Sequence, residues 1–232
     1  RDQIARHNVY LLNEQRVAKA VFDRVAHEGC LSAPNIQYRQ SPYALFNGDL
    51  LLAAHTPSGD THLLLADFTG HGLPAAIGAM PLAEVFYSMT AKGYGLGEML
   101  REMNAKLKRI LPVDMFCCAH VVCVSALRRS LEVWSGGMPD GYLHTLATGQ
   151  RTALSSQHVP LGVLKAKAFD HSTRVLPMLP GDQLFLLTDG VTETTGPDEQ
   201  LFGAQRLQRV LEANRDPQHL IDEVEQALRQ FQ

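Results

Sequence analysis

The sequence predicts an α+β fold in which antiparallel sheets pack between helices. Short apolar runs bounded by Gly, Pro, Asn and Asp are typical of strands, and here they come in neighbouring pairs separated by a few turn residues. The order along the chain is strands, a pair of helical segments, more strands and two final helical segments. It lacks the regular strand–helix alternation of a parallel sheet. A chain of 232 residues is long enough for one domain with a sizeable core, or for one domain and an appendage.

The first 28 residues predict a helix, because they contain neither Pro nor Gly and Gly29 supplies a stop. Apolar residues recur there every seven positions, at Ile4, Leu11, Ala18 and Val25. A coiled coil needs a second set of apolar positions in each heptad, and here that set is mostly polar. The pattern is therefore consistent both with a weak coiled coil and with a linker helix that packs locally. We therefore assign residues 1–30 to an N-terminal linker helix and residues 31–232 to the folded domain.

The elements that follow are predicted from their turn signals and periodicity. Residues 31–44 predict a loop and an edge strand, with Pro34 and Pro42 as breaks. Residues 49–68 predict a hairpin with a turn at 57–60, and the continuous apolar character of its strands indicates that both faces are covered. The remaining predicted elements are helices at about 73–90 and 97–110, a hairpin over 114–125 and 131–135, a strand pair within 140–154, strands at about 173–179 and 183–188, and helices at about 203–213 and 217–230.

The composition argues against two classes of partner. A net charge of −3 gives no general attraction to nucleic acid, and no stretch approaches the roughly 18–20 uninterrupted apolar residues of a membrane span. Three of the four cysteines lie in one apolar, strand-like run, which favours reduced core thiols and a cytoplasmic protein. The chain begins with Arg1 and shows no signal peptide, so we expect it to be a piece of a longer protein.

Aspartate residues in three short stretches supply the strongest chemical signal. Each stretch joins an apolar run to glycine: Asn47-Gly48-Asp49, Asp67-Phe68-Thr69-Gly70-His71-Gly72 and Thr188-Asp189-Gly190. An aspartate at the end of a buried strand places its carboxylate at the rim of a sheet, and three converging carboxylates repel one another unless a cation lies between them. Hard divalent ions such as Mg²⁺ and Mn²⁺ bind oxygen ligands of this kind. One such stretch alone is more simply a turn or a helix cap, but the co-occurrence of three predicts a metal-dependent enzyme.

The combination of motifs resembles the PPM family of metal-dependent Ser/Thr protein phosphatases, in its bacterial SpoIIE-type branch, over about residues 10–215. Two features are specific. They are Asp67-Phe68-Thr69-Gly70-His71-Gly72-Leu73-Pro74-Ala75-Ala76, which begins eighteen residues after Asp49, and the run from Pro180-Gly181-Asp182 to Thr188-Asp189-Gly190-Val191-Thr192-Glu193. The supporting features are Met115-Phe116, Gly136-Gly137-Met138-Pro139, Pro160-Leu161-Gly162-Val163 and Phe202-Gly203.

The resemblance implies a four-layer α/β/β/α sandwich of two antiparallel sheets flanked by helices, with two Mn²⁺ or Mg²⁺ ions at one end. It implies that Asp49, Asp67 and Asp189 are the catalytic carboxylates and metal ligands. It also implies that the Phe68 carbonyl is a backbone ligand and that Asp67 bridges the two ions. The implied reaction is an in-line attack on phosphorus by a water that the ions make more acidic, without a covalent enzyme intermediate.

The sequence departs from the family pattern at three places. Leu52 stands where many relatives carry a second Asp, and Met138 stands where the usual Gly-His-Pro-Pro element has His. Relatives also have a late strand with an Asp-Asp pair that completes the metal site, and the sequence ends at Gln232 before any such pair. The resemblance therefore implies either a further carboxylate after Gln232 or a site that binds metal weakly.

The resemblance also implies a role in bacterial signal transduction. The substrate would be a phosphorylated protein, and in this branch it is usually an anti-sigma-factor antagonist whose dephosphorylation changes sigma-factor availability. A receiver or sensor domain would precede the N-terminal helix, and a homodimer would form through that helix. An alternative of a different class is a degenerate phosphatase fold that serves as a protein-binding adaptor in sigma-factor regulation without turnover. The altered Met138 position and the absent Asp pair favour the adaptor, whereas the three retained aspartates favour the enzyme.

Overall fold

The computed structural model describes residues 29–40, 48–70 and 73–232 of the chain. The predicted linker helix with its seven-residue seam lies outside the described residues, as do residues 41–44 of the predicted edge strand. Gly48 and Asp49 open the second described range, so two of the three residues of the first aspartate motif are within it.

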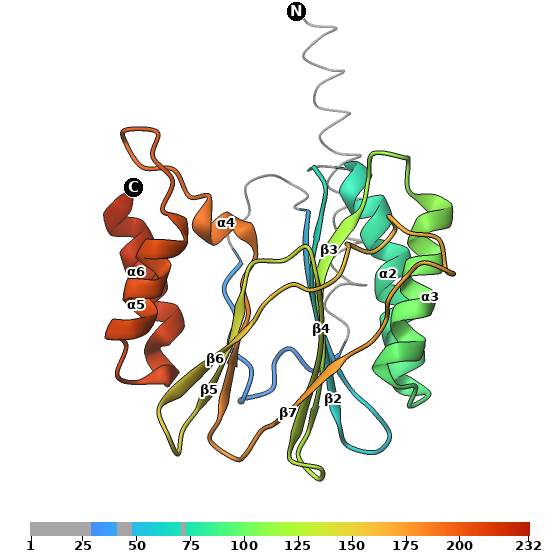
Figure 1. Cartoon of the computed structure of the whole chain (residues 1–232), viewed down its shortest axis with the longest axis horizontal. Helices are drawn as coiled ribbons and strands as arrows, with labels where there is room; N and C mark the ends of the chain where they lie inside the picture. The colour runs from blue at the N-terminus through green and yellow to red at the C-terminus, as the bar shows by residue number, and fades with distance from the viewer. Residues whose placement is uncertain (1–28, 41–47, 71–72) are drawn as a thin grey trace, which may run out of the picture.

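The described residues form four layers: two antiparallel sheets face each other, and a pair of helices covers the outer side of each sheet (Figure 1). The predicted four-layer α/β/β/α sandwich is therefore confirmed.

The first sheet has the order β1 (Asp49–His55), β2 (Thr61–Phe68), β3 (Cys117–Ser125), β4 (Ser130–Gly136) and β7 (Arg174–Pro177). The second has the order β6 (Gln150–Leu154), β5 (Gly141–Thr145) and β8 (Gln183–Phe185). The helices are α2 (Leu73–Ala91), α3 (Leu96–Ile110), the short α4 (Asp189–Thr192), α5 (Gly203–Ala213), the 3₁₀ turn η1 (Pro217–His219) and α6 (Leu220–Phe231).

The larger core lies between the first sheet and the helices α2 and α3. Along β2, Leu64, Ala66 and Phe68 are buried in this core, because alternate residues of a strand point to the same face. The intervening residues face the second sheet, and Leu63 packs there against a smaller core that includes Leu143. No residue of β2 is exposed, so the prediction that this strand is covered on both faces is confirmed.

The helices α5 and α6 cover the second sheet and form a third core. Leu207, Leu211 and Val224 from the helices are buried there, and Tyr142 and Phe185 from the sheet pack against them. Among the helices of the described residues, none has the length and apolar character needed to cross a membrane. All four cysteines are free, and of the three predicted core thiols Cys117 and Cys123 are buried whereas Cys118 is half-buried.

The predicted edge strand is wrong for residues 31–40, which contain no strand. The Cys30 N–H donates to the Ala53 carbonyl at the edge of β1 (2.9 Å), but the chain then turns, since the Ala33 N–H bonds back to the Cys30 carbonyl (3.0 Å). Bonds within the turn remove the donors that a ladder with β1 requires. The segment continues instead to α6, where Arg39 forms ion pairs with two acidic side chains.

The turn at residues 180–182 joins the two sheets rather than two paired strands. The preceding strand β7 bonds to β4 in the first sheet, whereas the following strand β8 bonds to β5 in the second. Asp182 fixes this crossing, because its carboxylate accepts hydrogen bonds from the N–H groups of Leu146 (2.9 Å) and Leu179 (2.8 Å). The strand that follows is shorter than predicted. Its three residues are half-buried, because β8 lies at one edge of the second sheet in the part of the chain that the structure describes.

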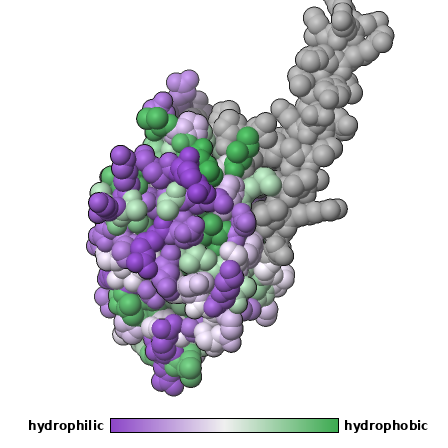
Figure 2. Space-filling model, turned by 90° about the vertical axis from the view of Figure 1, so that its right-hand side faces the viewer, coloured by the Kyte–Doolittle hydropathy of each residue, from purple (hydrophilic) through white to green (hydrophobic). Residues whose placement is uncertain are grey.

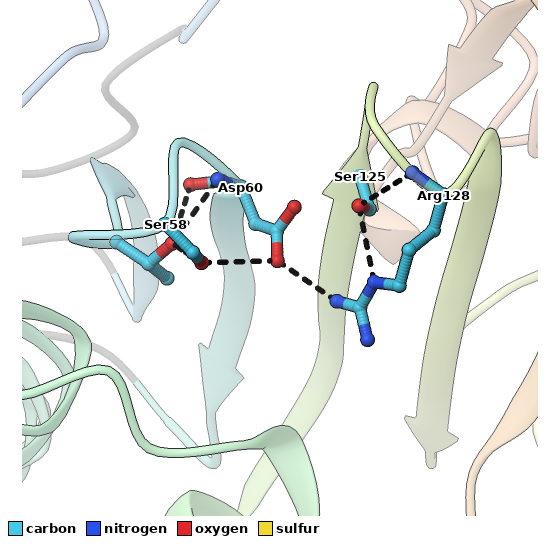
Figure 3. A network of polar contacts seen from close by, with 5 residues as sticks. Ser58, Asp60, Ser125 and Arg128 are labelled. Carbon is cyan, nitrogen blue, oxygen red and sulfur yellow. Dashed lines mark hydrogen bonds and ion pairs between the residues drawn. The ribbon is translucent and has the colours of Figure 1, made fainter.

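A polar network joins the two hairpin turns of the first sheet at the end remote from Asp67 (Figure 3). The Asp60 carboxylate accepts hydrogen bonds from Arg128 Nη2 (2.8 Å) and from the Ser58 hydroxyl (3.3 Å). Arg128 Nε in turn donates to the Ser125 hydroxyl (3.1 Å). The turn between β1 and β2 is thereby linked to the turn between β3 and β4.

Candidate metal centre

Asp49 and Asp67 stand opposite each other in the ladder between β1 and β2. Asp49 is the first residue of β1 and Asp67 is the last but one of β2. The antiparallel pairing therefore brings the start of one strand beside the end of the other. Their neighbours Leu50 and Phe68 are buried on the face toward α2 and α3, so the two carboxyl groups lie on the face toward the second sheet.

Gly48 leaves room for an oxygen-lined space beside Asp67. A Cβ atom at position 48 would lie 2.7 Å from the Phe68 carbonyl oxygen, and 2.9 Å from both Asp67 Oδ1 and the Gly70 carbonyl oxygen. One carboxylate oxygen and two carbonyl oxygens thus surround the space that a side chain here would fill. Glycine is required for such a close approach of backbone groups. A donor set made only of oxygen is the kind that hard divalent cations bind.

Backbone and side-chain hydrogen bonds hold this oxygen-lined space in place. The Phe68 N–H donates to the Gly48 carbonyl (3.0 Å), and the Phe68 side chain is anchored in the core. On the other side, the Thr69 hydroxyl donates to the Phe116 carbonyl (2.9 Å) and accepts from the Phe116 N–H (2.8 Å). Because the chain is held on both sides, the direction of the Phe68 carbonyl is set by the protein itself.

Asp189 approaches the same site from the second sheet. It is the first residue of α4, and Thr188 directly precedes it. The Thr188 hydroxyl donates a hydrogen bond to Asp49 Oδ2 (3.3 Å), which links the segment after β8 to the start of β1. The charge of Asp189 raises the pKa values of both Asp49 and Asp67. The structure therefore brings all three predicted carboxylates into one electrostatic site.

The carboxyl groups of the site are close together and partly buried, so each disfavours the ionised form of the others. Burial raises the pKa of Asp67 to about 7, together with the negative charges of three nearby carboxylates (Asp49, Asp189 and Glu193). The pKa of Asp49 is also raised, chiefly by burial, although the hydrogen bond from Thr188 acts in the opposite direction. Without a counter-charge the site therefore keeps a proton near neutral pH. A divalent cation supplies the counter-charge that displaces such a proton.

Two residues beside the site were not predicted from the sequence. Glu193 lies one helical turn after Asp189, and its N–H donates to the Asp189 carbonyl (2.8 Å). That four-residue spacing is a signal that could have identified it. Cys118 stands opposite Asp67 in the ladder between β2 and β3, and burial, followed by the charges of Asp67 and Asp189, raises its pKa to about 11. The thiol is therefore neutral and adds no charge to the site.

The donor set fits a hard divalent cation, since it consists of carboxylate and carbonyl oxygens. Within the parts of the chain that the structure describes, however, no three Asp, Glu, His or Cys side chains already stand in an arrangement that would hold a metal ion. Magnesium retains several water ligands and is usually bound through only one or two carboxylates, so a closed protein cage is not required.

The two altered family positions that fall in the described residues supply no polar group to the site. Leu52 is fully buried on the face of β1 toward the helices, away from the carboxylates. Met138 is buried beside Gly137, where an added Cβ would lie 2.6 Å from Cys118 Sγ. Neither altered position carries a charge and the Cys118 thiol is neutral, so the negative charge of the site comes from Asp and Glu alone.

Comparisons with known proteins point to one family. The family model described as Stage II sporulation protein E (SpoIIE) matches residues 57–232. That match begins in the turn before β2 and includes both Asp67 and Asp189. No curated protein sequence gives a match.

Several solved structures share the fold at low sequence identity. The SiaA-PP2C domain of Pseudomonas aeruginosa is 19% identical, with a TM-score of 0.79 over 97% of this chain and 92% of that chain. The PP2C phosphatase domain of SpoIIE from Bacillus subtilis, solved with a fragment of its regulatory domain, is 15% identical, with a TM-score of 0.66 over 82% of this chain and 55% of that chain. RsbX in complex with magnesium is 14% identical, with a TM-score of 0.58 over 80% of each chain.

Proposed function

This chain belongs to the SpoIIE family of PP2C-type phosphatase domains, and we propose that it is a Mn²⁺- or Mg²⁺-dependent protein serine/threonine phosphatase domain. The observation that supports this proposal most directly is the pairing of Asp49 with Asp67 beside the oxygen-lined space at Gly48. Paired, partly buried carboxylates destabilise a fold unless a cation balances them. Their presence therefore favours a role in metal binding and catalysis over a role in stabilising the fold.

We propose that Asp49, Asp67 and Asp189, together with the Phe68 carbonyl, would hold two divalent ions. When bound, such ions lower the pKa of a water molecule and polarise the phosphoryl oxygens, which permits direct hydrolysis of a phosphate ester. The magnesium in the RsbX structure, which shares this fold, supports a divalent ion here.

The protein's own groups orient the carboxylates and set the charge of the site. The Thr188 hydroxyl holds the Asp49 carboxylate, which limits the directions in which its oxygens can point. Asp67 keeps a proton near neutral pH until a counter-charge arrives. Asp49, Asp67 and Asp189 alone would repel a phosphate dianion, so phosphate binding depends on the cations that they collect.

We further propose that the substrate is a phosphoserine or phosphothreonine of another protein, with an anti-sigma-factor antagonist as the expected class. Residues 1–30 would form a linker helix between a receiver or sensor domain and the phosphatase domain of residues 31–232, in a cytoplasmic protein that dimerises through this helix. The SpoIIE structure, which contains a phosphatase domain and a fragment of a regulatory domain, supports a regulatory domain in the same chain.

Hydrolysis of p-nitrophenyl phosphate and of a phosphoserine peptide tests this function. We expect phosphate release that requires Mn²⁺ or Mg²⁺ and stops when a chelator is added. Asp67→Asn and Asp189→Asn should each lower kcat by about 100-fold or more, because each removes a charged metal ligand. Asp60→Asn, at the far end of the sheet, serves as the matched control. Full activity in either site variant would exclude the assigned ligands.

The second candidate function is the adaptor, which binds a regulatory protein without turnover. It is favoured by the absence, within the described ranges, of three side chains poised to hold a metal ion, and by the neutral, buried Met138 at the altered family position. Isothermal titration with Mn²⁺ separates the two functions. Binding with a dissociation constant in the micromolar range, lost in Asp67→Asn, supports the enzyme. An absence of both metal binding and phosphate release supports the adaptor.

A further inference from the structure

The loop of residues 159–171 is fastened to α3 and to the first sheet, so its surface has a fixed shape. Asn104 of α3 is buried, and it accepts a hydrogen bond from the Gly162 N–H (2.9 Å) and donates one to the Leu164 carbonyl (3.0 Å). Leu161 exchanges two backbone hydrogen bonds with Cys117 at the start of β3 (2.8 and 3.0 Å). The exposed side chains of this loop are therefore presented by a rigid support.

Two basic residues of α3 lie beside this loop. Gly97 and Asn104 both face the loop, since an added Cβ at Gly97 would lie 3.4 Å from the His171 ring and Asn104 bonds to the loop backbone. Arg101 and Lys108 lie three or four residues from these positions, so they belong to the same ridge of the helix. The loop itself contributes two exposed lysines. We call the resulting set the basic face, and it consists of Arg101, Lys108, Lys165 and Lys167.

The four basic side chains make no direct polar contact with any other residue that the structure describes. All four side chains are exposed, and in the described part of the chain none of them forms a hydrogen bond or an ion pair. By contrast, Lys106 on another side of α3 pairs with Glu84 of α2 (3.8 Å). The nearest acidic residue of the loop, Asp170, is turned to the Ser172 N–H (2.9 Å) and to His158. A positive surface therefore persists on a chain whose net charge is −3.

The basic face adjoins the candidate metal centre. Leu161 of the loop bonds to Cys117, and the neighbouring Phe116 bonds to Thr69, which is two residues after Asp67. The end of α3 and the loop lie at the same end of the sandwich as the start of α2, in the upper right of Figure 1. In Figure 2, which views the molecule from this side, polar residues cover much of the surface, and apolar patches lie at its upper end and at its lower edge. Exposed apolar residues next to these elements are Ile77, Val113 and Val163.

We infer that the basic face docks an acidic surface of the phosphoprotein substrate and so directs its phosphorylated residue to the metal centre. This inference rests on the proposed phosphatase function. A positive surface beside an acidic catalytic site attracts a negatively charged partner and raises its rate of association. The exposed apolar residues beside the basic face favour a protein partner over a polyanion such as nucleic acid, because apolar contact is typical of the centre of a protein interface.

Charge reversal with a matched control tests this inference on the full chain. The test variant is Lys108→Glu with Lys165→Glu, one change on each element of the basic face. The control is Arg209→Glu with Arg215→Glu, which makes the same change in net charge at exposed positions on the opposite outer layer. The probes are phosphorylated β-casein, an acidic phosphoprotein, and p-nitrophenyl phosphate. We expect roughly a tenfold rise in KM for casein in the test variant only, with kinetics for the aryl phosphate unchanged.

A casein KM that is unchanged in the test variant, or raised equally in the control, overturns the inference while leaving the phosphatase function intact. If neither probe is hydrolysed, the proposed function fails, and fluorescence anisotropy of labelled casein still decides the docking surface. Weaker casein binding in the test variant alone supports the surface, and equal binding in all variants rejects it. Binding to phosphatidylserine vesicles that the test variant loses, without any change for casein, would assign the basic face to a lipid surface instead.

Discussion

Asp49 and Asp67 face each other directly across the β1–β2 ladder, so two carboxyl groups occupy adjacent positions on one face of the sheet. Like charges in such a cross-strand pair destabilise a sheet. Here the destabilisation is increased by partial burial, which raises the pKa of Asp67 to about 7. The metal-free protein therefore contains an unfavourable repulsion between these two carboxylates, and neutralisation of either residue removes it.

Asp67→Asn should stabilise the metal-free protein at pH 8 while abolishing phosphatase activity. The raised pKa means that the contribution of Asp67 to stability is present below its unfolded value near 4 and is lost as the pH rises toward 7. Asparagine removes the charge, and we expect a gain of about 1–2 kcal/mol in the free energy of unfolding, after allowance for solvent screening. Urea denaturation in the presence of a chelator measures this gain, and a loss of stability would contradict the predicted repulsion.

Gly48→Ala should remove metal-dependent activity without unfolding the protein. The added methyl group would occupy the space between the Asp67 carboxylate and the Phe68 carbonyl, at distances below 3.0 Å. We expect the affinity for Mn²⁺, measured by calorimetry, to fall by about 10–100-fold, with a far-UV circular dichroism spectrum that is unchanged. Gly95→Ala is the matched control, because no atom lies within 4 Å of its added Cβ. Unaltered Mn²⁺ binding in Gly48→Ala would separate this space from the metal centre.

Asn104→Ala should weaken both the fold and the docking of substrate. The substitution leaves the Gly162 N–H and the Leu164 carbonyl without their partner in a buried place. The expected loss is about 2–3 kcal/mol in the free energy of unfolding. Because the loop then loses its attachment to α3, KM for casein should also rise while KM for p-nitrophenyl phosphate stays the same. A change below about 0.5 kcal/mol would show that other contacts suffice to hold the loop.

His120 should make the protein less stable as the pH falls from about 6.5 to 4. In the neutral ring its Nε2–H donates to the Pro139 carbonyl (3.0 Å) and its Nδ1 accepts from the Ser135 hydroxyl (2.6 Å). The Nδ1 bond in this direction requires the neutral ring, whereas the protonated ring also donates to the carbonyl. Burial lowers its pKa to about 4, so the unfolded chain binds a proton that the folded chain does not. Stability from this residue is therefore present above the unfolded pKa and is lost on acidification.

Asp67 acts with the opposite sign over an overlapping pH range, so the two effects partly cancel in the metal-free protein. Asp67→Asn should therefore reveal the His120 effect as a steeper fall in stability below pH 6.5, up to about 1.4 kcal/mol per pH unit. His120→Asn in the same background should flatten it. Urea titrations at pH 4.5, 5.5 and 6.5 make the comparison, and identical pH slopes in the two variants would rule out this role for His120.

The hairpin that holds Asp49 and Asp67 could be predicted because both of its strands are marked locally, by continuous apolar runs on either side of a turn that contains Gly59. The position of Cys118 beside Asp67 could not, since the register between β2 and β3 is set by strands separated by a pair of helices. The turn at Gly181 carries the same local signal as a hairpin, yet it leads to the other sheet. The partner of each flanking strand is chosen by tertiary packing, which a local pattern does not specify.

The crossing at residues 180–182 has a mechanical consequence. Asp49 and Asp67 belong to the first sheet, while Asp189 follows the last strand of the second, so the proposed ligands come from both halves of the sandwich. A cation bound by all three would link the two sheets, and its binding free energy would stabilise the packing of one sheet against the other. Removal of the metal by a chelator should then weaken the contact between the sheets before it affects either sheet alone. The rate of hydrogen exchange should rise first at the backbone amides around Thr188.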